Sequence, residues 1–307
     1  MTRIVDETHP DTPTRSGKGL KVTLLALVMT VVLITVYWLG TQNGRNHTPA
    51  PAATGDITPT ETATPTTTES PPLVVTVTEE LIPGLYRGTA TVSTGNAREV
   101  YGVKVGWDRT VDGAVGAAMS VAGADRCLAG VVESTAAELF PHLYTGQSLE
   151  DILHDPAWVG YRQVIRDASR LSDDGVVMDA NNPTLPSTEE RFYGGAIPEY
   201  GVYKITNIEN DTDGQPLRVE VWTFLPRYSG TGTDTNMDGV VRSFELIRDV
   251  MVWVDNDWKS EDGGIEASTD VRVTNPGWEF IMSQVGEGWA VPADGTQDPI
   301  PGAVLTQ

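Results

Sequence analysis

One apolar segment near the N-terminus limits what this chain can fold into more than any other feature. Val22–Leu39 is 18 residues long, carries no charged side chain and has only three threonines as polar interruptions. As an α-helix it would be about 27 Å long, close to the bilayer core of about 30 Å. A cleaved signal peptide is the alternative, but its apolar region is usually shorter, and no clear small-residue cleavage site follows this segment. We therefore expect an uncleaved transmembrane helix.

The charges on either side of this segment predict its orientation. Arg15, Lys18 and Lys21 precede it, whereas Arg45 is the only nearby cation that follows it. Cytoplasmic flanks of membrane spans are enriched in Lys and Arg. The pattern therefore predicts a single-pass protein of the cell membrane, with a cytoplasmic tail at residues 1–21 and all of the chain after the span outside.

Residues 40–72 are expected to be a disordered linker. From Thr48 to Pro72 there are nine threonines and six prolines in 25 residues. Such a composition cannot bury enough apolar surface to offset the entropy cost of ordering the chain. The extracytoplasmic folded domain is then expected over residues 73–291, with a flexible C-terminal tail at 292–307.

Charge and cysteine content exclude several classes of protein. The chain has 42 acidic and 21 basic residues, a net charge of −21. Binding to nucleic acid needs a basic surface, so no direct contact with nucleic acid is expected. The single cysteine, Cys127, excludes an intramolecular disulfide and a thiolate zinc cluster.

In the folded part, the hydrophobic pattern changes from helical to strand-like along the chain. Thr110 can cap an alanine-rich helix, and Asp155, which precedes a proline, starts a second helix with apolar residues at helical spacing. The period then becomes two, in Tyr200–Ile208, Leu217–Leu225 and Val240–Val254. Helices followed by an antiparallel meander predict an α+β fold. We expect a cone-like domain in which N-terminal helices pack on a bent antiparallel sheet.

Two groups of side chains are open to different interpretations. Arg162, Arg166 and Arg170 line one face of the second helix at spacings of four residues, which is typical of a solvated face, with contact to a partner as the alternative. Trp278 and Trp289 near the C-terminus are either contact points for a partner or core residues.

Three segments resemble a known group of proteins. They are YGVKVGWDRTVDGAVGAAMSVA (Tyr101–Ala122), VEVWTF (Val219–Phe224) and VMVWVDNDWK (Val250–Lys259). These motifs are similar to those of actinobacterial single-pass membrane proteins related to the bitopic core component of type IV secretion and Gram-positive conjugation systems. The resemblance implies an outer domain with the nuclear-transport-factor-two-like cone fold and a scaffold role. It supplies no catalytic residues, because the matching positions are packing and turn positions.

One local motif predicts a metal site. Its residues fit the calcium-loop pattern D-x-[DN]-x-[DN]-G-x₅-E, and they are Asp234, Asn236, Asp238, Val240 and Glu245. In such a loop the first three side chains and the carbonyl of the fourth residue would bind Ca²⁺, and the final carboxylate would close the shell. The flanking sequence is strand-like rather than helical, so a β-hairpin turn is the alternative. No other cofactor is expected.

The sequence points to interaction rather than catalysis. None of the patterns G-x-S-x-G, Walker A or G-x-G-x-x-G occurs. We expect a non-enzymatic bitopic scaffold of a cell-envelope complex, in conjugative transfer or type IV secretion, with protein partners or self-association. The alternative is an extracytoplasmic module that senses or carries a ligand or calcium. An enzyme would need a titratable residue at the mouth of an apolar pocket.

Overall fold

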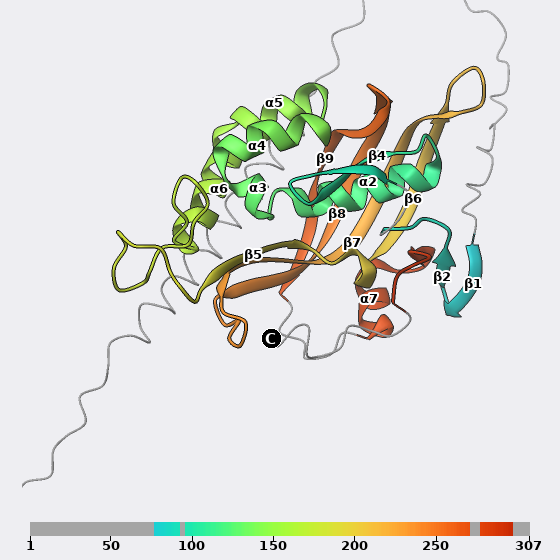
Figure 1. Cartoon of the computed structure of the whole chain (residues 1–307). Coiled ribbons are helices and arrows are strands. Elements are labelled where there is room, and N and C mark those ends of the chain that lie inside the picture. The colour runs from blue at the N-terminus through green and yellow to red at the C-terminus, as the bar shows by residue number, and fades with distance from the viewer. Residues whose placement is uncertain (1–76, 93–95, 271–276, 297–307) are drawn as a thin grey trace, which may run out of the picture. The chain divides into compact units, whose positions relative to one another are not determined.

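A computed structural model describes residues 77–92, 96–270 and 277–296 (Figure 1). All of these residues belong to one compact unit, Glu69–Gln307. The predicted cytoplasmic tail, membrane span and linker lie outside the described residues. Within the described ranges, no helix is both long enough and apolar enough to cross a membrane.

The described residues form ten strands and several helices, and most of the strands pair in one sheet. The strands are β1 (Val77–Ile82), β2 (Leu85–Gly88), β3 (Asn96–Val100), β4 (Val103–Trp107), β5 (Arg191–Ala196), β6 (Val202–Asn210), β7 (Pro216–Gly232), β8 (Val240–Val254), β9 (Asp257–Asp270) and β10 (Trp289–Val291). The α-helices are α2 (Val111–Ala124), α3 (Leu128–Val131), α4 (Glu133–Leu139), α5 (Gly146–His154), α6 (Pro156–Ala168) and α7 (Trp278–Val285).

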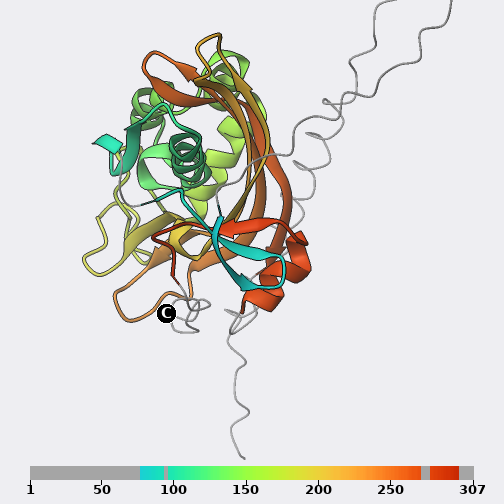
Figure 2. The same ribbon diagram turned by 90° about the vertical axis from the view of Figure 1, so that its right-hand side faces the viewer.

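The main sheet is mixed, and it curves around α2 (Figure 2). Its strand order is β1-β2-β10-β6-β7-β8-β9, and β5 pairs with the far half of β7. The α+β class is confirmed. The expectation of a purely antiparallel sheet is wrong at one pair, because β10 enters the sheet between β2 and β6 and runs parallel to β2. β3 and β4 form a separate hairpin.

Local sequence signals set the starts of the two main helices. The hydroxyl of Thr110 accepts a hydrogen bond from the amide of Gly113 at 2.9 Å, which caps α2. The carboxylate of Asp155 accepts one from the amide of Ala157 at 2.7 Å, which caps α6. Each cap satisfies an amide that the helix itself leaves without a partner. Both predicted starts are confirmed.

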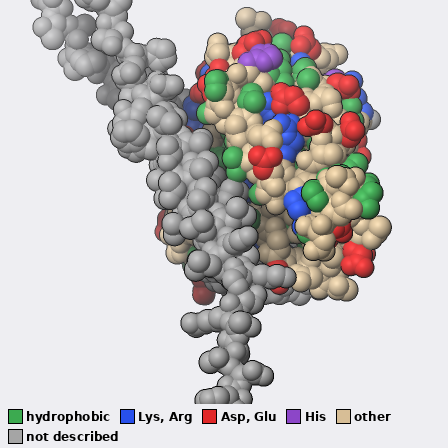
Figure 3. Space-filling view, turned by 90° about the vertical axis from the view of Figure 1, so that its left-hand side faces the viewer, with side chains coloured by type: hydrophobic (Ala, Val, Ile, Leu, Met, Phe, Trp, Pro, Cys, Tyr) green, Lys and Arg blue, Asp and Glu red, His purple; other side chains and the backbone are tan. Residues whose placement is uncertain are grey.

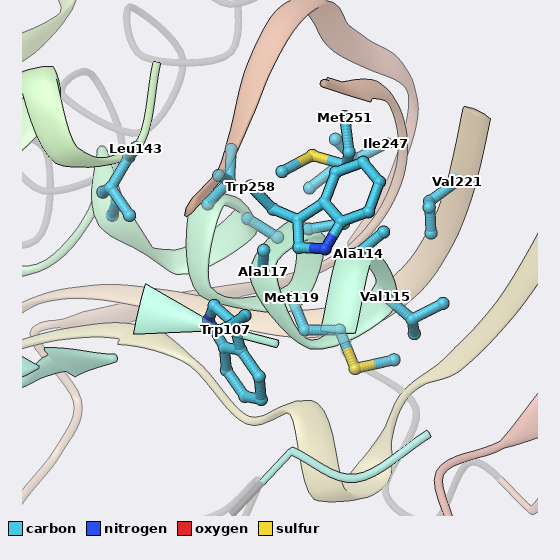
Figure 4. Close-up of a cluster of buried hydrophobic side chains, with 14 of the residues drawn as sticks. Trp107, Ala114, Val115, Ala117, Met119, Leu143, Val221, Ile247, Met251 and Trp258 are labelled. Carbon is cyan, nitrogen blue, oxygen red and sulfur yellow. The ribbon is translucent and has the colours of Figure 1, made fainter. Parts of the chain in front are cut away.

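The larger hydrophobic core forms where α2 crosses the sheet (Figure 4). Trp107, Met251 and Trp258 are nearly fully buried in it. A Cβ added at Gly116 would lie 2.4 Å from the ring of Trp107, so α2 can approach this closely only because it carries a glycine there. The small residues that the sequence places in this helix therefore permit the close packing.

A second hydrophobic cluster forms on the other face of the sheet. Side chains alternate between the faces of a strand, so Leu225 joins the α2 core while its neighbour Phe224 joins the second cluster. Trp289 is buried in this cluster, and Trp278 packs against it. Trp289 is therefore a core residue, whereas Trp278 is partly buried at the edge of this cluster.

The predicted solvated face of α6 is wrong for Arg162. This side chain is 1% exposed, and its guanidinium donates to the carbonyl oxygens of Ile152 and Leu153. It also forms an ion pair with Glu133 at 3.2 Å. The end of α5 and the start of α4 meet α6 on this face, and helical periodicity cannot foresee such a contact.

The residues that follow β10 contact the body of the domain. The amide of Ala293 donates to the carbonyl of Ala90 at 2.7 Å, and the amide of Val92 donates to the carboxylate of Asp294 at 2.8 Å. Residues 292–296 of the predicted C-terminal tail therefore hydrogen-bond to the segment that follows β2. The remainder of that tail lies outside the described residues.

Candidate ligand pocket on the concave face of the sheet

The structure does not assemble the predicted calcium loop. The segment connects β7 to β8, as in the hairpin alternative, and Val240 is the first residue of β8. The carboxylate of Asp234 accepts a hydrogen bond from the hydroxyl of Tyr193 at 3.1 Å. The side-chain oxygen of Asn236 accepts one from the amide of Asp238 at 2.8 Å. Across the described ranges, no group of three or more His, Cys, Asp or Glu side chains is placed to hold a metal.

Glu245, the expected final calcium ligand, lies instead in a buried ion-pair network. It is 1% exposed, and its two carboxylate oxygens accept hydrogen bonds from Arg126 and Arg227. The hydroxyl of Ser243 donates a third bond at 2.6 Å. Arg227 also pairs with Asp125. In this structure both carboxylate oxygens of Glu245 are therefore paired with arginines rather than directed to the loop.

The charges in this network compensate one another. Burial by itself raises the pKa of Glu245, but Arg227 and Arg126 outweigh it, and its pKa lies below the ordinary value. Burial lowers the pKa of Arg227, but Asp125 and Glu245 outweigh it, so the guanidinium stays charged. Two guanidiniums thus face two carboxylates, the arrangement in which buried charges are tolerated.

A pocket of about 150 Å³ lies beside this network on the concave face of the sheet. From the helical side it is lined by Tyr144, Ile152 and Trp158, and from β8 by Ile247 and Asp249. Arg227 and Asp125 of the ion-pair network also reach its wall, together with part of β9. The wall of the pocket therefore combines apolar side chains with several charged ones.

Asp249 is a buried titratable group in the wall of this pocket. Its side chain lines the pocket and is 3% exposed. One carboxylate oxygen, Oδ1, accepts a hydrogen bond from the hydroxyl of Ser260 at 2.9 Å. The other, Oδ2, has no hydrogen-bond partner among the described residues. Nine buried side-chain atoms of the described residues have no partner, and Oδ2 is the one that belongs to a carboxyl group. Because this carboxyl group lines the pocket, it is the candidate contact for a ligand.

Burial gives Asp249 an unusual pKa. Loss of solvation raises the pKa to about 7, although the hydrogen bond from Ser260 and the charge of Arg227 lower it. Asp125 contributes a further increase. Tyr144 also lines the pocket, and burial raises its pKa well above 10, so its hydroxyl stays protonated. The Asp249 carboxyl group therefore ionises near neutral pH, and this changes the net charge of the pocket wall.

A bulge in the sheet brings Ser260 to Asp249. The pairing of β8 with β9 shifts by one residue, so that Met251 is opposite Ser260 while Asp249 is opposite Gly263. Extra residues of this kind re-aim side chains and are common next to functional sites. The serine thereby faces the same side of the sheet as the carboxylate.

The segment before α5 closes one side of the pocket through the same serine. The backbone of Ser260 donates to the carbonyl of Leu143 at 2.8 Å and accepts from the amide of Thr145 at 3.0 Å. Tyr144 lies between these two residues, so its position beside the pocket is fixed by backbone hydrogen bonds to β9.

Asp249 belongs to no sequence motif, but the strand pattern around it carries a signal. The residue falls in the predicted strand Val240–Val254, two positions from Ile247 and two from Met251. These three side chains face the same side of the sheet, so a carboxylate is placed in an inward-facing row. Glu245 continues that row, and this alternation was the only local indication of both buried acids.

No family model matches the chain, and no curated protein or solved structure matches it either. The fold and the pocket define the class of protein: an α+β domain with a small pocket on the concave face of a mixed sheet, in whose described wall one buried carboxyl group, Asp249, has no ion-pair partner. The function is therefore argued from this pocket and from the sequence pattern.

Proposed function

We propose that this chain is a membrane-anchored binding protein whose outer domain holds a small ligand in the pocket beside Asp249. The observation that carries the proposal is the unpartnered Oδ2 of a nearly fully buried carboxyl group that lines a pocket. A carboxyl group with a pKa near 7 disfavours folding at neutral pH, because the unfolded chain ionises more readily. Groups of this kind cluster at functional sites.

The membrane anchor and the extracytoplasmic location belong to the proposal. Val22–Leu39 and the basic residues before it support them. The curvature of the sheet around α2 supports the finer expectation of a cone-like domain related to the nuclear-transport-factor-two-like fold (Figure 2). The proposal assigns binding and no catalytic step.

Native mass spectrometry of the full-length chain, purified in detergent from cells that produce it, tests this function. We expect a ligand-bound mass that is lost in the Asp249→Asn variant and kept in Asp174→Asn, which removes an exposed carboxylate on a distant loop. Absence of a bound mass, together with no change in melting temperature across a library of small polar compounds, would contradict the proposal.

The scaffold function remains a second proposal. The expected membrane span and the Thr/Pro-rich sequence that follows it are suited to present a domain to neighbouring proteins in the cell envelope. Crosslinking in intact cells with a C-terminal affinity tag tests it. Recovery of a secretion ATPase, a polytopic channel protein or further copies of the chain would support a scaffold, and recovery of the monomer alone would contradict it.

A further inference from the structure

The charged groups that line the pocket are mostly acidic. They include five carboxylates but only one cation, and the carboxylates are Asp125, Asp151, Asp249, Glu261 and Asp262. The cation, Arg227, is already compensated by Asp125 and by Glu245 of the ion-pair network. The pocket therefore offers no spare positive charge to an anionic ligand.

Ion pairs compensate the two carboxylates from β9. Glu261 pairs with Arg218 at 2.6 Å, and Asp262 pairs with Arg248 at 3.0 Å. Asp151 and Asp249 have no ion-pair partner among the described residues. Asp151 is exposed and accepts a hydrogen bond from Gln147, so Asp249 is the one buried carboxyl group in the wall without a cation.

The face of the domain shown in Figure 3 has the same sign as the pocket. On the side of the domain where α5 and α6 lie, acidic side chains are more numerous than basic ones (Figure 3). A surface field of one sign raises the local concentration of ligands that carry the opposite charge. Cations are therefore attracted towards the helices that form one wall of the pocket.

From these observations we infer that the ligand is a small organic cation, an alkylammonium group that donates to the carboxylate of Asp249. This rests on the proposed function and names the ligand class of that site. The side chain of Ile247 would contact the hydrocarbon part, and the ring of Trp158 would contact the ammonium group, because an indole is the aromatic group that attracts cations most strongly. A cavity of about this volume can hold a benzene-sized molecule, so the ligand has only a few carbon atoms.

Binding of a cation is then coupled to the proton on Asp249. Four groups act on this carboxyl: Arg227 from β7, Asp125 at the end of α2, Ser260 from β9, and Arg248, which precedes Asp249 on β8. Their combined effect with burial leaves the pKa at about 7. A bound cation favours the ionised form, so affinity rises as the pH increases through 7, while an alkylammonium group stays protonated up to about pH 10.

Three probes of equal length and different charge test the inference: propylammonium, propan-1-ol and propanoate. Their dissociation constants are measured by ligand-observed NMR on the full-length chain in detergent. At pH 8 we expect propylammonium to bind at least tenfold more tightly than the other two. At pH 5.5, where Asp249 is protonated, its affinity is expected to fall at least tenfold.

Variants identify the residues responsible. Asp249→Asn, a near-isosteric change, is expected to weaken propylammonium at least tenfold and to remove the pH dependence, with Asp174→Asn as the matched control. Trp158→Leu is expected to weaken the cation several-fold and leave propan-1-ol unchanged. If circular dichroism shows that Asp249→Asn is poorly folded, Trp158→Leu still tests whether the pocket prefers the cation.

Equal or tighter binding of propan-1-ol or propanoate would overturn the inferred ligand class, as would the absence of binding by all three probes. A ligand-bound mass in the native spectrum would still uphold the proposed function in that case. If that spectrum also contains only the free chain, both the inference and the proposed function fail.

Discussion

Glu245 and Asp249 are four residues apart on β8, face the same side of the sheet and are almost equally buried. Their pKa values nevertheless move in opposite directions. The pKa of Glu245 is lowered because Arg227 and Arg126 outweigh the effect of burial, whereas burial raises that of Asp249 to about 7. Burial alone therefore does not determine the role of a buried acid. The first is held in the ion-pair network, and the second lines the pocket without an ion-pair partner among the described residues.

Removing the central cation of the network should produce the largest effect. Arg227→Met leaves Asp125 buried without its ion-pair partner, and we expect a loss of about 3–5 kcal/mol in the free energy of unfolding. Urea denaturation followed by tryptophan fluorescence measures it. The matched control is Arg218→Met, which breaks a half-exposed pair with Glu261 and should cost less than about 1 kcal/mol.

A double variant sharpens this result. Arg227→Met leaves the charge of Asp125 unpaired, and adding Asp125→Asn removes that charge. The double variant should therefore be more stable than Arg227→Met alone. A double variant that is less stable than the single one would show that the network does not act through charge compensation.

The second prediction concerns the uncompensated acid. Between about pH 4 and pH 7 the unfolded chain loses the proton of Asp249 while the folded chain keeps it, so this residue lowers stability as the pH rises. A shift of about three pKa units corresponds to roughly 4 kcal/mol. Asp249→Asn should therefore be more stable than the natural chain at pH 8, by up to this amount, and similar to it at pH 4.

Denaturation series at several pH values measure this slope. Glu245 contributes in the opposite sense and in a lower window, because its lowered pKa stabilises the fold above about pH 4.5 and the benefit is lost as the pH falls. The same slope between pH 5 and 7 in the natural chain and in Asp249→Asn would show that Asp249 is ionised in the folded state.

The third prediction uses two adjacent glycines of β9. A Cβ at Gly263 would lie 2.5 Å from Oδ1 of Asp249 and 2.8 Å from the carbonyl oxygen of Arg248, whereas a Cβ at Gly264 meets no atom within 4 Å. Gly263→Ala should cost about 1–3 kcal/mol through overpacking and displace the carboxyl group. Gly264→Ala should change stability little. Equal melting temperatures for the two variants would contradict the close approach of β9 to Asp249.

The smallest effect is expected at the rim of the pocket. Asp262→Asn removes a carboxylate that is 63% exposed and pairs with Arg248 at 3.0 Å. Exposed pairs contribute about 0–1 kcal/mol, and salt screens them. Thermal unfolding at low and high salt should show a small difference that disappears at high salt. A loss as large as that of Arg227→Met would remove the distinction between rim and interior.

The sequence by itself determined the local elements. The caps at Thr110 and Asp155 and the strand pattern of Val240–Val254 depend on residues that are close together in the chain, and the structure reproduces them. Short-range hydrogen bonds and the alternation of side chains are sufficient for such features. The α+β class follows from their order.

Only the tertiary structure decided which acids matter. The loop motif grouped Glu245 with Asp234, yet the partners of Glu245 include Arg126, which is 119 residues away in the chain. Asp249 acquires its properties from a bulge in β9 and from a segment held by Ser260. Electrostatic and packing interactions between distant segments set a pKa, and these distances exist only after the sheet has closed around α2.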